Sequence, residues 1–224
     1  GSLAEAGWLP HSSNAADAAM EKKWASMPDE KTLNETAEAI RSRGIPVVIV
    51  GSGGEALAKI KQMIPAGAEV MNGSSVTLKQ IGFLDYLKSG SHGWRNLHAD
   101  VVAAKGKEEL LRRRRMSILA DFFLGSVNAI AKTGELVACD RTGSRIGAYP
   151  FAAKKLLLVS GAQKIVPTLD EALRRVREYV YPLEDQRARA AYGEPSAIGK
   201  CVIIAQEVYR ERTTLILIRE RLGF

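Results

Sequence analysis

The sequence has few cysteines, and this scarcity excludes several kinds of site. Among its 224 residues only Cys139 and Cys201 are cysteines, and they form no Cys-x-x-Cys pair and no cluster with histidine. A structural zinc site or an iron-sulfur cluster takes about four such ligands, so this chain's thiolates can build neither. No short cysteine spacings suggest a disulfide framework. We expect no metal site, and both cysteines to be small buried hydrophobic residues.

Long apolar runs are also missing. The longest, such as Val47 to Val50 and Leu156 to Val159, fall far short of the roughly 20 residues that a membrane helix needs. The N-terminus lacks the basic start and apolar stretch of a secretory signal, so we expect a cytoplasmic protein with no membrane partner. Residues 1–19 are small and polar without periodicity, which indicates an added or disordered segment ahead of one domain, 20–224.

Aromatic residues make up only 6% of the chain, although its formal net charge is +7. A nucleic-acid surface gathers its cations on one face with aromatics between them, whereas basic and acidic residues alternate here along Glu171 to Arg189. The exception is the run Arg112 to Arg115, which would point around most of a helix and form no single stripe. This pattern argues against a nucleic acid partner and leaves a local anion site or a subunit contact at these arginines.

What the sequence does contain is a dense run of small residues between Ala120 and Gly161. Strands are predicted at Val127 to Ala131 and Glu135 to Cys139, joined by a turn in which Gly134 is free to take a positive φ. Lys155 to Ser160 is typical of a strand buried on both faces.

The small residues in this run allow two interpretations. They either let a ligand approach the backbone amides closely or let a helix pack tightly on the sheet. The residues concerned are Gly125, Ser126, Ala129 and Ala131.

Elsewhere strands and helices alternate along the chain. Helices are predicted at Asp29 to Arg43, Glu55 to Met63, Val76 to Gly82, Lys107 to Phe123, Leu169 to Tyr181 and Leu183 to Ala191. Further strands are predicted at Ile45 to Val50, Ala68 to Met71, Cys201 to Ala205 and Thr213 to Arg219, the last two completing the sheet. The order predicts an α/β fold with a mainly parallel open sheet, an antiparallel hairpin insertion and helices on both faces.

Two polar turns lead from a strand into a helix. The turn Gly51 to Gly54 lacks both the nucleotide-loop lysine and the dinucleotide fingerprint, so it is a weak nucleotide motif. In the turn Asn72 to Ser75, a serine could cap the following helix, and free amides there could attract an anion. Capping alone is the alternative. The carboxyl ends of parallel strands form one rim, where ligand sites usually lie.

A few charged residues beside the hairpin could take part in chemistry. Glu135 is a weak candidate for an acid or base, since a glutamate beside a turn is usually only solvated. Arg145 could grip a carboxylate or phosphate with two hydrogen bonds, although salt bridges with Asp140 are the ordinary explanation. No nucleophile has its base nearby in the sequence, so the catalytic residues stay unknown.

Five segments resemble the LUD (lactate-utilisation) domain family. They are MNGSSVTLKQIG at 71–82, SHGWRNL at 91–97, DFFLGSVNAIAKTGELV at 121–137, VSGAQKIVPTLDEAL at 159–173 and TLILIRERLGF at 214–224. The resemblance implies the fold shared by sugar-phosphate isomerases, glucosamine-phosphate deaminases and coenzyme A transferases. It also implies ligand contacts from Gly73, Ser74, Ser75, Gly125, Ser126, Asn128, Thr133, Gly134, Thr142, Gly143 and Ser144.

The resemblance carries an expectation about function as well. Some members look like subunits of an iron-sulfur complex that oxidises L-lactate to pyruvate. We expect this chain to bind a small anionic metabolite, because its segments of small residues leave backbone amides free. It lacks the cysteine motifs of larger relatives, so it would carry no cofactor, and any iron-sulfur clusters would belong to oxidoreductase partners; a homodimer is compatible with this. Two alternatives stay open: a non-catalytic assembly subunit that docks through Arg112 to Arg115, or an isomerase-like or transferase-like enzyme acting on phosphorylated or coenzyme A-linked substrates.

Overall fold

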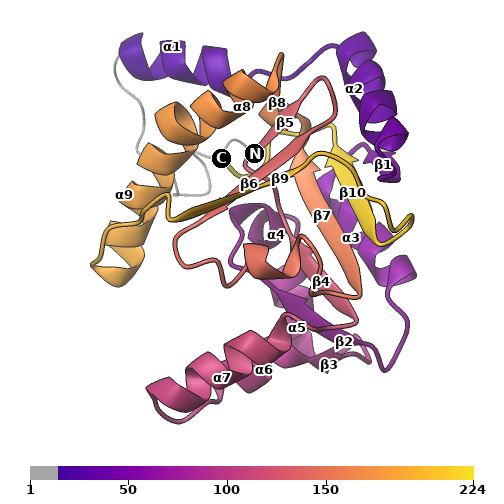
Figure 1. Cartoon of the computed structure of the whole chain (residues 1–224), viewed down its shortest axis with the longest axis vertical. Coiled ribbons are helices and arrows are strands. Elements are labelled where there is room, and N and C mark those ends of the chain that lie inside the picture. Colours follow the sequence, from indigo (N-terminus) through magenta and orange to yellow (C-terminus); the bar gives the residue numbers. More distant parts are fainter. Residues whose placement is uncertain (1–14) are drawn as a thin grey trace.

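The computed structural model describes residues 15–224 and contains two sheets (Figure 1). The larger sheet has six strands, all paired in parallel. In spatial order they are β1 (Val47–Val50), β10 (Thr213–Ile218), β7 (Lys155–Gly161), β4 (Phe122–Gly125), β2 (Glu69–Asn72) and β3 (Arg95–Asn96). The predicted α/β class with a mainly parallel sheet is therefore confirmed.

The predicted hairpin belongs to a second sheet of four strands. Its order is β8 (Ile165–Val166), β5 (Ala129–Ala131), β6 (Leu136–Asp140) and β9 (Lys200–Ile204). Strands β5 and β6 pair antiparallel, and Gly134 takes a φ of 102° in their turn, as predicted. The expectation that the last two strands complete one sheet is wrong, because β9 pairs with β6 while β10 lies inside the parallel sheet.

Helices cover both faces of the parallel sheet, and the alternation of side chains along its strands explains why. Leu156 and Leu158 point into one core with helix α2 (Glu30–Ser42). Leu157 points into the other core with helix α3 (Gly53–Met63). Since successive side chains of a strand point to opposite faces, β7 is buried on both sides, which confirms the prediction for this segment.

The remaining helices complete the described chain. They are α1 (Ala15–Trp24), α4 (Val76–Gln80), α5 (Phe83–Ser89), α6 (Leu97–Val102), α7 (Lys107–Ser117), α8 (Leu169–Arg175) and α9 (Tyr181–Tyr192), with the 3-10 turns η1 (Ile146–Ala148) and η2 (Ala162–Lys164) and the π-helical turn η3 (Val176–Val180). Helices α6 and α7 project from the body of the molecule (Figure 1). Within residues 15–224, no helix combines the length and apolar character needed to cross a membrane.

Two helix predictions need correction. The helix expected over Lys107 to Phe123 ends at Ser117, because Phe122 and Phe123 already belong to β4, between β2 and β7. The helix expected over Leu169 to Tyr181 continues through η3 into α9. Pro182 lies in the first turn of α9, directly after the π-helical turn η3, and the helix continues through it. Of the segment 1–19, only the part from Ala15 is described, and residues 1–14 lie outside the described chain.

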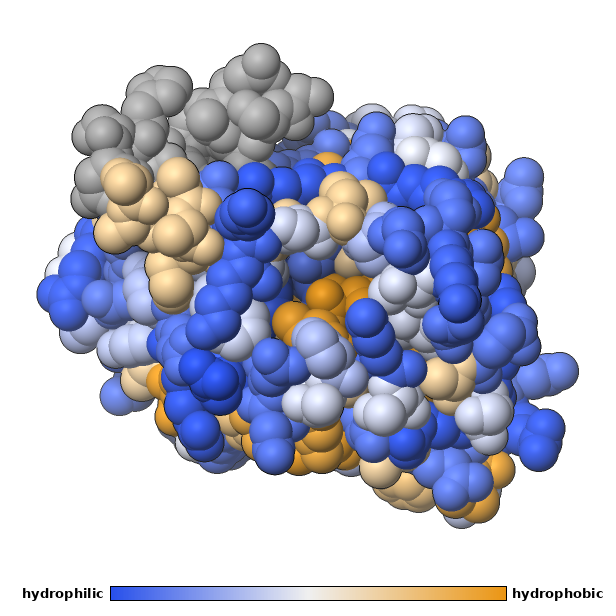
Figure 2. Space-filling view, turned by 90° about the horizontal axis from the view of Figure 1, so that it is seen from above, coloured by the Kyte–Doolittle hydropathy of each residue, from blue (hydrophilic) through white to orange (hydrophobic). Residues whose placement is uncertain are grey.

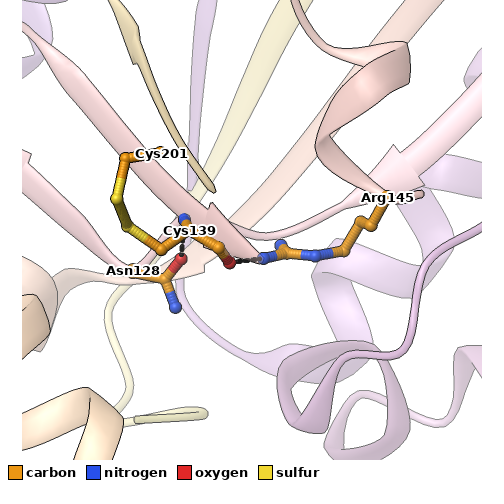
Figure 3. Close-up of a disulfide and its surroundings, with 4 residues drawn as sticks. All are labelled: Asn128, Cys139, Arg145 and Cys201. Atoms are coloured by element: carbon orange, nitrogen blue, oxygen red, sulfur yellow. Dashed lines mark hydrogen bonds between the residues drawn. A yellow bond between two sulfur atoms is a disulfide. The ribbon is translucent and has the colours of Figure 1, made fainter. Parts of the chain in front are cut away.

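The prediction for the cysteines is wrong. Cys139 of β6 and Cys201 of β9 lie directly opposite each other and form a disulfide, with their Cα atoms 4.2 Å apart (Figure 3). Cys201 is exposed and Cys139 half-buried. The two are 62 residues apart in sequence, so only the pairing of β6 with β9 brings them together.

The surface seen in Figure 2 is mostly hydrophilic, and apolar residues show in a hollow near the centre of that view.

Candidate functional site

A cleft of about 1150 Å³ opens at the carboxyl ends of β2 and β4. Its floor includes Asn72, which ends β2, and Ser126, which follows β4. One wall comes from the loop after β6 together with η3 and α9, and the other from α6 and α7. These groups of helices flank the same end of the parallel sheet in Figure 1. The cleft therefore lies at the rim where the parallel sheet predicted a site.

The structure brings most of the predicted ligand contacts together, but not all of them. Those that line the cleft are Gly73, Ser74, Ser75, Ser126, Asn128, Thr142, Ser144 and Arg145. Those outside its lining are Gly125, Thr133, Gly134, Gly143 and the acid/base candidate Glu135.

The tip of the hairpin faces helix α2 instead of the cleft. Arg43, which follows α2, donates from Nε to the Thr133 carbonyl at 2.7 Å and forms a salt bridge of 2.8 Å with Glu135. Burial raises the pKa of Glu135, but hydrogen bonds and the Arg43 charge outweigh this and hold that pKa below its ordinary value. Glu135 is thus an ionised partner of Arg43, held at the hairpin turn.

At two positions of the predicted site, packing leaves no room for any side chain, which explains why glycine stands there. A Cβ atom at Gly73 would lie 2.3 Å from the Arg145 side chain, and one at Gly125 would lie 2.0 Å from the Tyr149 hydroxyl. Both distances are far inside van der Waals contact. At these positions the absence of a side chain makes room for Arg145 and Tyr149. For Gly125, neither interpretation of the small residues predicted this contact.

Arg145 links the loop after β6 to the end of β4. Its Nη1 donates to the Ser126 carbonyl and to the Tyr149 hydroxyl, both at 3.0 Å. Its Nη2 donates to the Cys139 carbonyl at 2.5 Å (Figure 3). Its backbone N–H donates to Asp140 at 2.9 Å. The guanidinium is therefore held by main-chain and phenol oxygens, and its positive charge remains at the cleft.

The most unusual group in the cleft is Lys164, which the sequence did not single out. It lies in η2 directly after β7 and is only 3% exposed. Its Nζ donates to the Val127 carbonyl at 2.9 Å, to the Ser126 hydroxyl at 3.1 Å and to the Thr77 hydroxyl at 3.4 Å. These partners are all formally neutral.

The electrostatic surroundings of Lys164 are unfavourable to its charge. Burial lowers its pKa well below the ordinary value, and the positive charges of Arg175 and Arg145 lower it further. Among the described residues, no carboxylate is a cause of this shift. A lysine in a sequence is normally predicted to be exposed, so the burial of Lys164 becomes visible only in the structure. The one hint in the sequence is its position shortly after a buried strand.

Arg175 lies behind the cleft and is fully buried. It donates to the main-chain oxygens of Trp24 at 2.7 Å, of Phe224 at 3.2 Å and of Asn128. Burial lowers its pKa to about 10. Asn128 in turn accepts from the Cys139 N–H at 2.7 Å through Oδ1 (Figure 3). These contacts fix the polypeptide that carries Ser126 to Asn128 along the cleft.

Asn72 offers an acceptor that the protein leaves unused. The residue is 3% exposed, and its Nδ2 donates to the Gly73 carbonyl at 3.2 Å. Because a carbonyl can only accept, the amide nitrogen must face it. Oδ1 then has no hydrogen-bond partner among the described residues. A buried acceptor without a donor costs about 1–3 kcal/mol, so a ligand hydroxyl or amine is a suitable partner.

The outer part of the cleft is lined by further basic and polar groups. Arg114 donates to the Ser144 hydroxyl at 2.6 Å, so one member of the arginine run faces the cleft. Arg112 and Arg113 instead form salt bridges with Glu109 at 2.8 and 2.6 Å. Ser75 caps α4 by accepting from the Leu78 N–H at 3.2 Å, which confirms the capping interpretation for this residue.

The described residues of this cleft do not form a metal-binding cluster. Within residues 15–224, no group of three or more histidine, cysteine or carboxylate side chains lies close enough to hold one.

Comparison with known proteins identifies the family. Residues 33–218 match the family model described as the LUD domain. Among solved structures, this chain is similar to the crystal structure of a DUF162 family protein from Deinococcus radiodurans, with a TM-score of 0.51 and 13% identity, covering 86% of this chain and 99% of that one. At this identity the likeness concerns the fold alone. No curated protein matches the sequence. The chain belongs to the LUD domain family.

Proposed function

We propose that the cleft binds a small anionic metabolite and that Lys164 is its central recognition group. The observation that carries this proposal is a buried amino group with neutral hydrogen-bond partners and two guanidinium groups as its charged surroundings. A buried charge is stable only when it is paired or neutralised. A bound carboxylate or phosphate would place a negative charge beside this amine and these guanidinium groups, which would favour the protonated form of Lys164 and recover part of the desolvation free energy.

A hydroxy acid is the ligand class that fits this chemistry best. The carboxylate would face the Arg145 guanidinium and the Lys164 amino group, while the hydroxyl would donate to the unpaired Oδ1 of Asn72. L-Lactate, the metabolite in the family's name, contains both groups. The cleft slightly exceeds the 300–1,000 Å³ typical of pockets for larger ligands, so a longer hydroxy acid or a phosphorylated one is also accommodated.

A role in lactate oxidation would require redox partners. Both cysteines of this chain are joined in a disulfide, so iron-sulfur clusters, where the pathway uses them, would belong to other subunits. In this proposal the LUD domain holds the substrate anion and the partners accept the electrons.

Thermal unfolding against a ligand panel tests the proposal directly. The panel contains L-lactate, D-lactate, pyruvate, glucose 6-phosphate and coenzyme A. A ligand at about a hundred times its Kd should stabilise the fold by roughly 2.7 kcal/mol, which for this length raises Tm by about 5 to 10 °C. Lys164→Met should lose the shift, whereas Lys132→Met, an exposed lysine at the hairpin turn outside the cleft, should keep it. The proposal fails if no member of the panel raises the Tm of the wild-type protein.

A second candidate function is a non-catalytic assembly subunit, and the projecting helices α6 and α7 favour it. They expose Val102 by 70% and Met116 by 57%, beside the exposed Arg112 and Arg115. Exposed apolar side chains and cations on the same two helices suit an acidic protein partner. Arg112→Glu with Arg115→Glu should then abolish copurification of an iron-containing partner while leaving the ligand-induced Tm shift unchanged. Copurification that survives this reversal would contradict docking at these helices.

A further inference from the structure

Lys164 has the surroundings of a reactive amine as well as those of an anion-binding group. It lines the cleft, its side chain is almost completely buried, and it extends from a short 3-10 turn anchored at the end of the central strand β7. The groups that would normally keep a buried lysine protonated are carboxylates, and no described carboxylate forms a hydrogen bond or a salt bridge with Lys164, although Asp140 and Glu184 also line the cleft.

We propose that the Nζ of Lys164 forms a Schiff base with the carbonyl carbon of an anionic oxo compound, such as a 2-oxo acid, bound in the cleft. This inference rests on the proposed function, because the same cleft must first hold the anion. It extends that function from reversible recognition to covalent activation of a carbonyl.

A neutral amine is the first requirement for this step. Burial, followed by the positive charges of Arg175 and Arg145, lowers the pKa of Lys164 well below its ordinary value. Each unit of lowering raises the fraction of neutral amine near pH 7 about tenfold. Lys132 and Lys154 are exposed and lie outside the cleft, so they serve as internal references.

Groups that can move protons are the second requirement, and they already contact the amine. The Ser126 hydroxyl lies 3.1 Å from Nζ and the Thr77 hydroxyl 3.4 Å from it, and the two hydroxyls are 3.4 Å from each other. A hydroxyl both donates and accepts, so the pair can pass a proton to or from the reacting centre. The Val127 carbonyl fixes the amine in place at 2.9 Å.

The step balances without an oxidant or a further reactant. The nitrogen lone pair attacks the carbonyl carbon, the carbonyl π electrons move to oxygen, and that oxygen takes up a proton while nitrogen loses one, which gives a carbinolamine. Loss of its hydroxyl as water forms the C=N bond, and hydrolysis reverses the sequence. Asn72 Oδ1, the unpaired acceptor in the same cleft, can accept from the carbinolamine hydroxyl. Arg145 retains its charge throughout and faces the ligand's carboxylate.

Reductive trapping provides the test. The purified chain is incubated at pH 7 with pyruvate and sodium cyanoborohydride, and the products are followed by intact mass and by peptide mapping. We expect one adduct per chain at Lys164, formed at least tenfold faster than at the exposed Lys132 or Lys154, which lie outside the cleft. Lys164→Arg, which keeps the charge, should form none. An absence of adduct, or labelling spread evenly over exposed lysines, would overturn the proposal.

The outcome is separable from that of the proposed function. A ligand-induced Tm shift without trapping would retain anion binding and reject the Schiff base. Absence of any Tm shift together with selective trapping at Lys164 would retain the reactive amine and reject tight reversible binding. Glyoxylate and glyceraldehyde 3-phosphate, used in parallel with pyruvate, distinguish a carboxylate from a phosphate as the anionic group.

Discussion

The guanidinium of Arg145 donates to the main-chain oxygen of Cys139 at 2.5 Å, and the side chain of Cys139 is joined to Cys201 on the neighbouring strand (Figure 3). One residue thus connects the cleft to the edge of the small sheet. Arg145 also reaches the Ser126 carbonyl at 3.0 Å. Ser126, which follows β4, and the loop after β6 line the cleft, and they are linked through Arg145 and Cys139 to the edge strand β9.

Reduction of the disulfide should loosen this wall. A disulfide that closes a loop of this length stabilises a protein by about 2–4 kcal/mol, which for 224 residues corresponds to a fall in Tm on the order of 5 to 15 °C. Thermal unfolding with and without dithiothreitol measures it. Cys139→Ser with Cys201→Ser should unfold at the temperature of the reduced wild type and should not respond to dithiothreitol. Equal Tm values for oxidised and reduced wild type would contradict the prediction.

Substitution of Gly73 should displace Arg145. The added methyl group of Gly73→Ala would lie 2.3 Å from Cγ and Cδ of Arg145, and such overpacking costs about 1–3 kcal/mol. The matched control is Gly54→Ala in helix α3, where the nearest atom is 3.8 Å away and alanine favours the helix. Urea unfolding should show a lower unfolding free energy for Gly73→Ala than for the wild type, and no decrease for Gly54→Ala. Equal stability of both variants would mean that the Arg145 side chain is free to move.

Local sequence signals predicted the elements that depend on nearby residues. The apolar run of β7 and the glycine turn between β5 and β6 are examples, because burial pattern and turn chemistry reside in the segment itself. The first two residues of β4, Phe122 and Phe123, are predicted as the end of the preceding helix, since a short apolar run fits the end of a helix as well as a buried strand. This segment forms a strand because it pairs with β2 on one side and β7 on the other, and both strands lie far away in sequence.

The candidate site was predictable only in part, for the same reason. The rim position followed from the parallel sheet, and segments such as Asn72 to Ser75 followed from the strand ends. Lys164 and the Cys139–Cys201 bond did not, because each owes its character to partners on other elements. A sequence gives no burial for a lone lysine and no register for two strands 62 residues apart.

Glu135 should matter for stability and not for ligand binding. Its pKa is held below the ordinary value despite burial, by hydrogen bonds and by Arg43. A carboxylate whose pKa is lower in the folded state stabilises the protein above the unfolded-state pKa of about 4.5, and this contribution is lost as the pH falls through the lowered value. Glu135→Gln should therefore lower the unfolding free energy at pH 7 by about 1 kcal/mol. The decrease in unfolding free energy on acidification should be smaller in this variant than in the wild type.

The matched control for Glu135 is Glu35→Gln on α2, an exposed pair with Lys31 at 3.9 Å, which should change stability little. Calorimetry with the ligand found in the panel completes the comparison. A loss of affinity in Glu135→Gln at unchanged stability would restore Glu135 as a site residue.

The pH dependence of stability provides a test of the Lys164 environment that needs no ligand. Its pKa is well below the ordinary value of 10.5 in the folded state, so between the two pKa values the unfolded chain binds more protons than the folded one. Stability attributable to this group therefore rises with pH across that window, by up to about 1.4 kcal/mol per pH unit. Lys164→Met lacks the titrating group, and its unfolding free energy between pH 8 and 10 should rise less steeply than that of the wild type. Lys132→Met, which keeps the buried amine, should follow the wild-type curve. Parallel curves for wild type and Lys164→Met would mean that the amine titrates in the folded protein as it does in water, and would remove the electrostatic basis for both the anion site and the reactive amine.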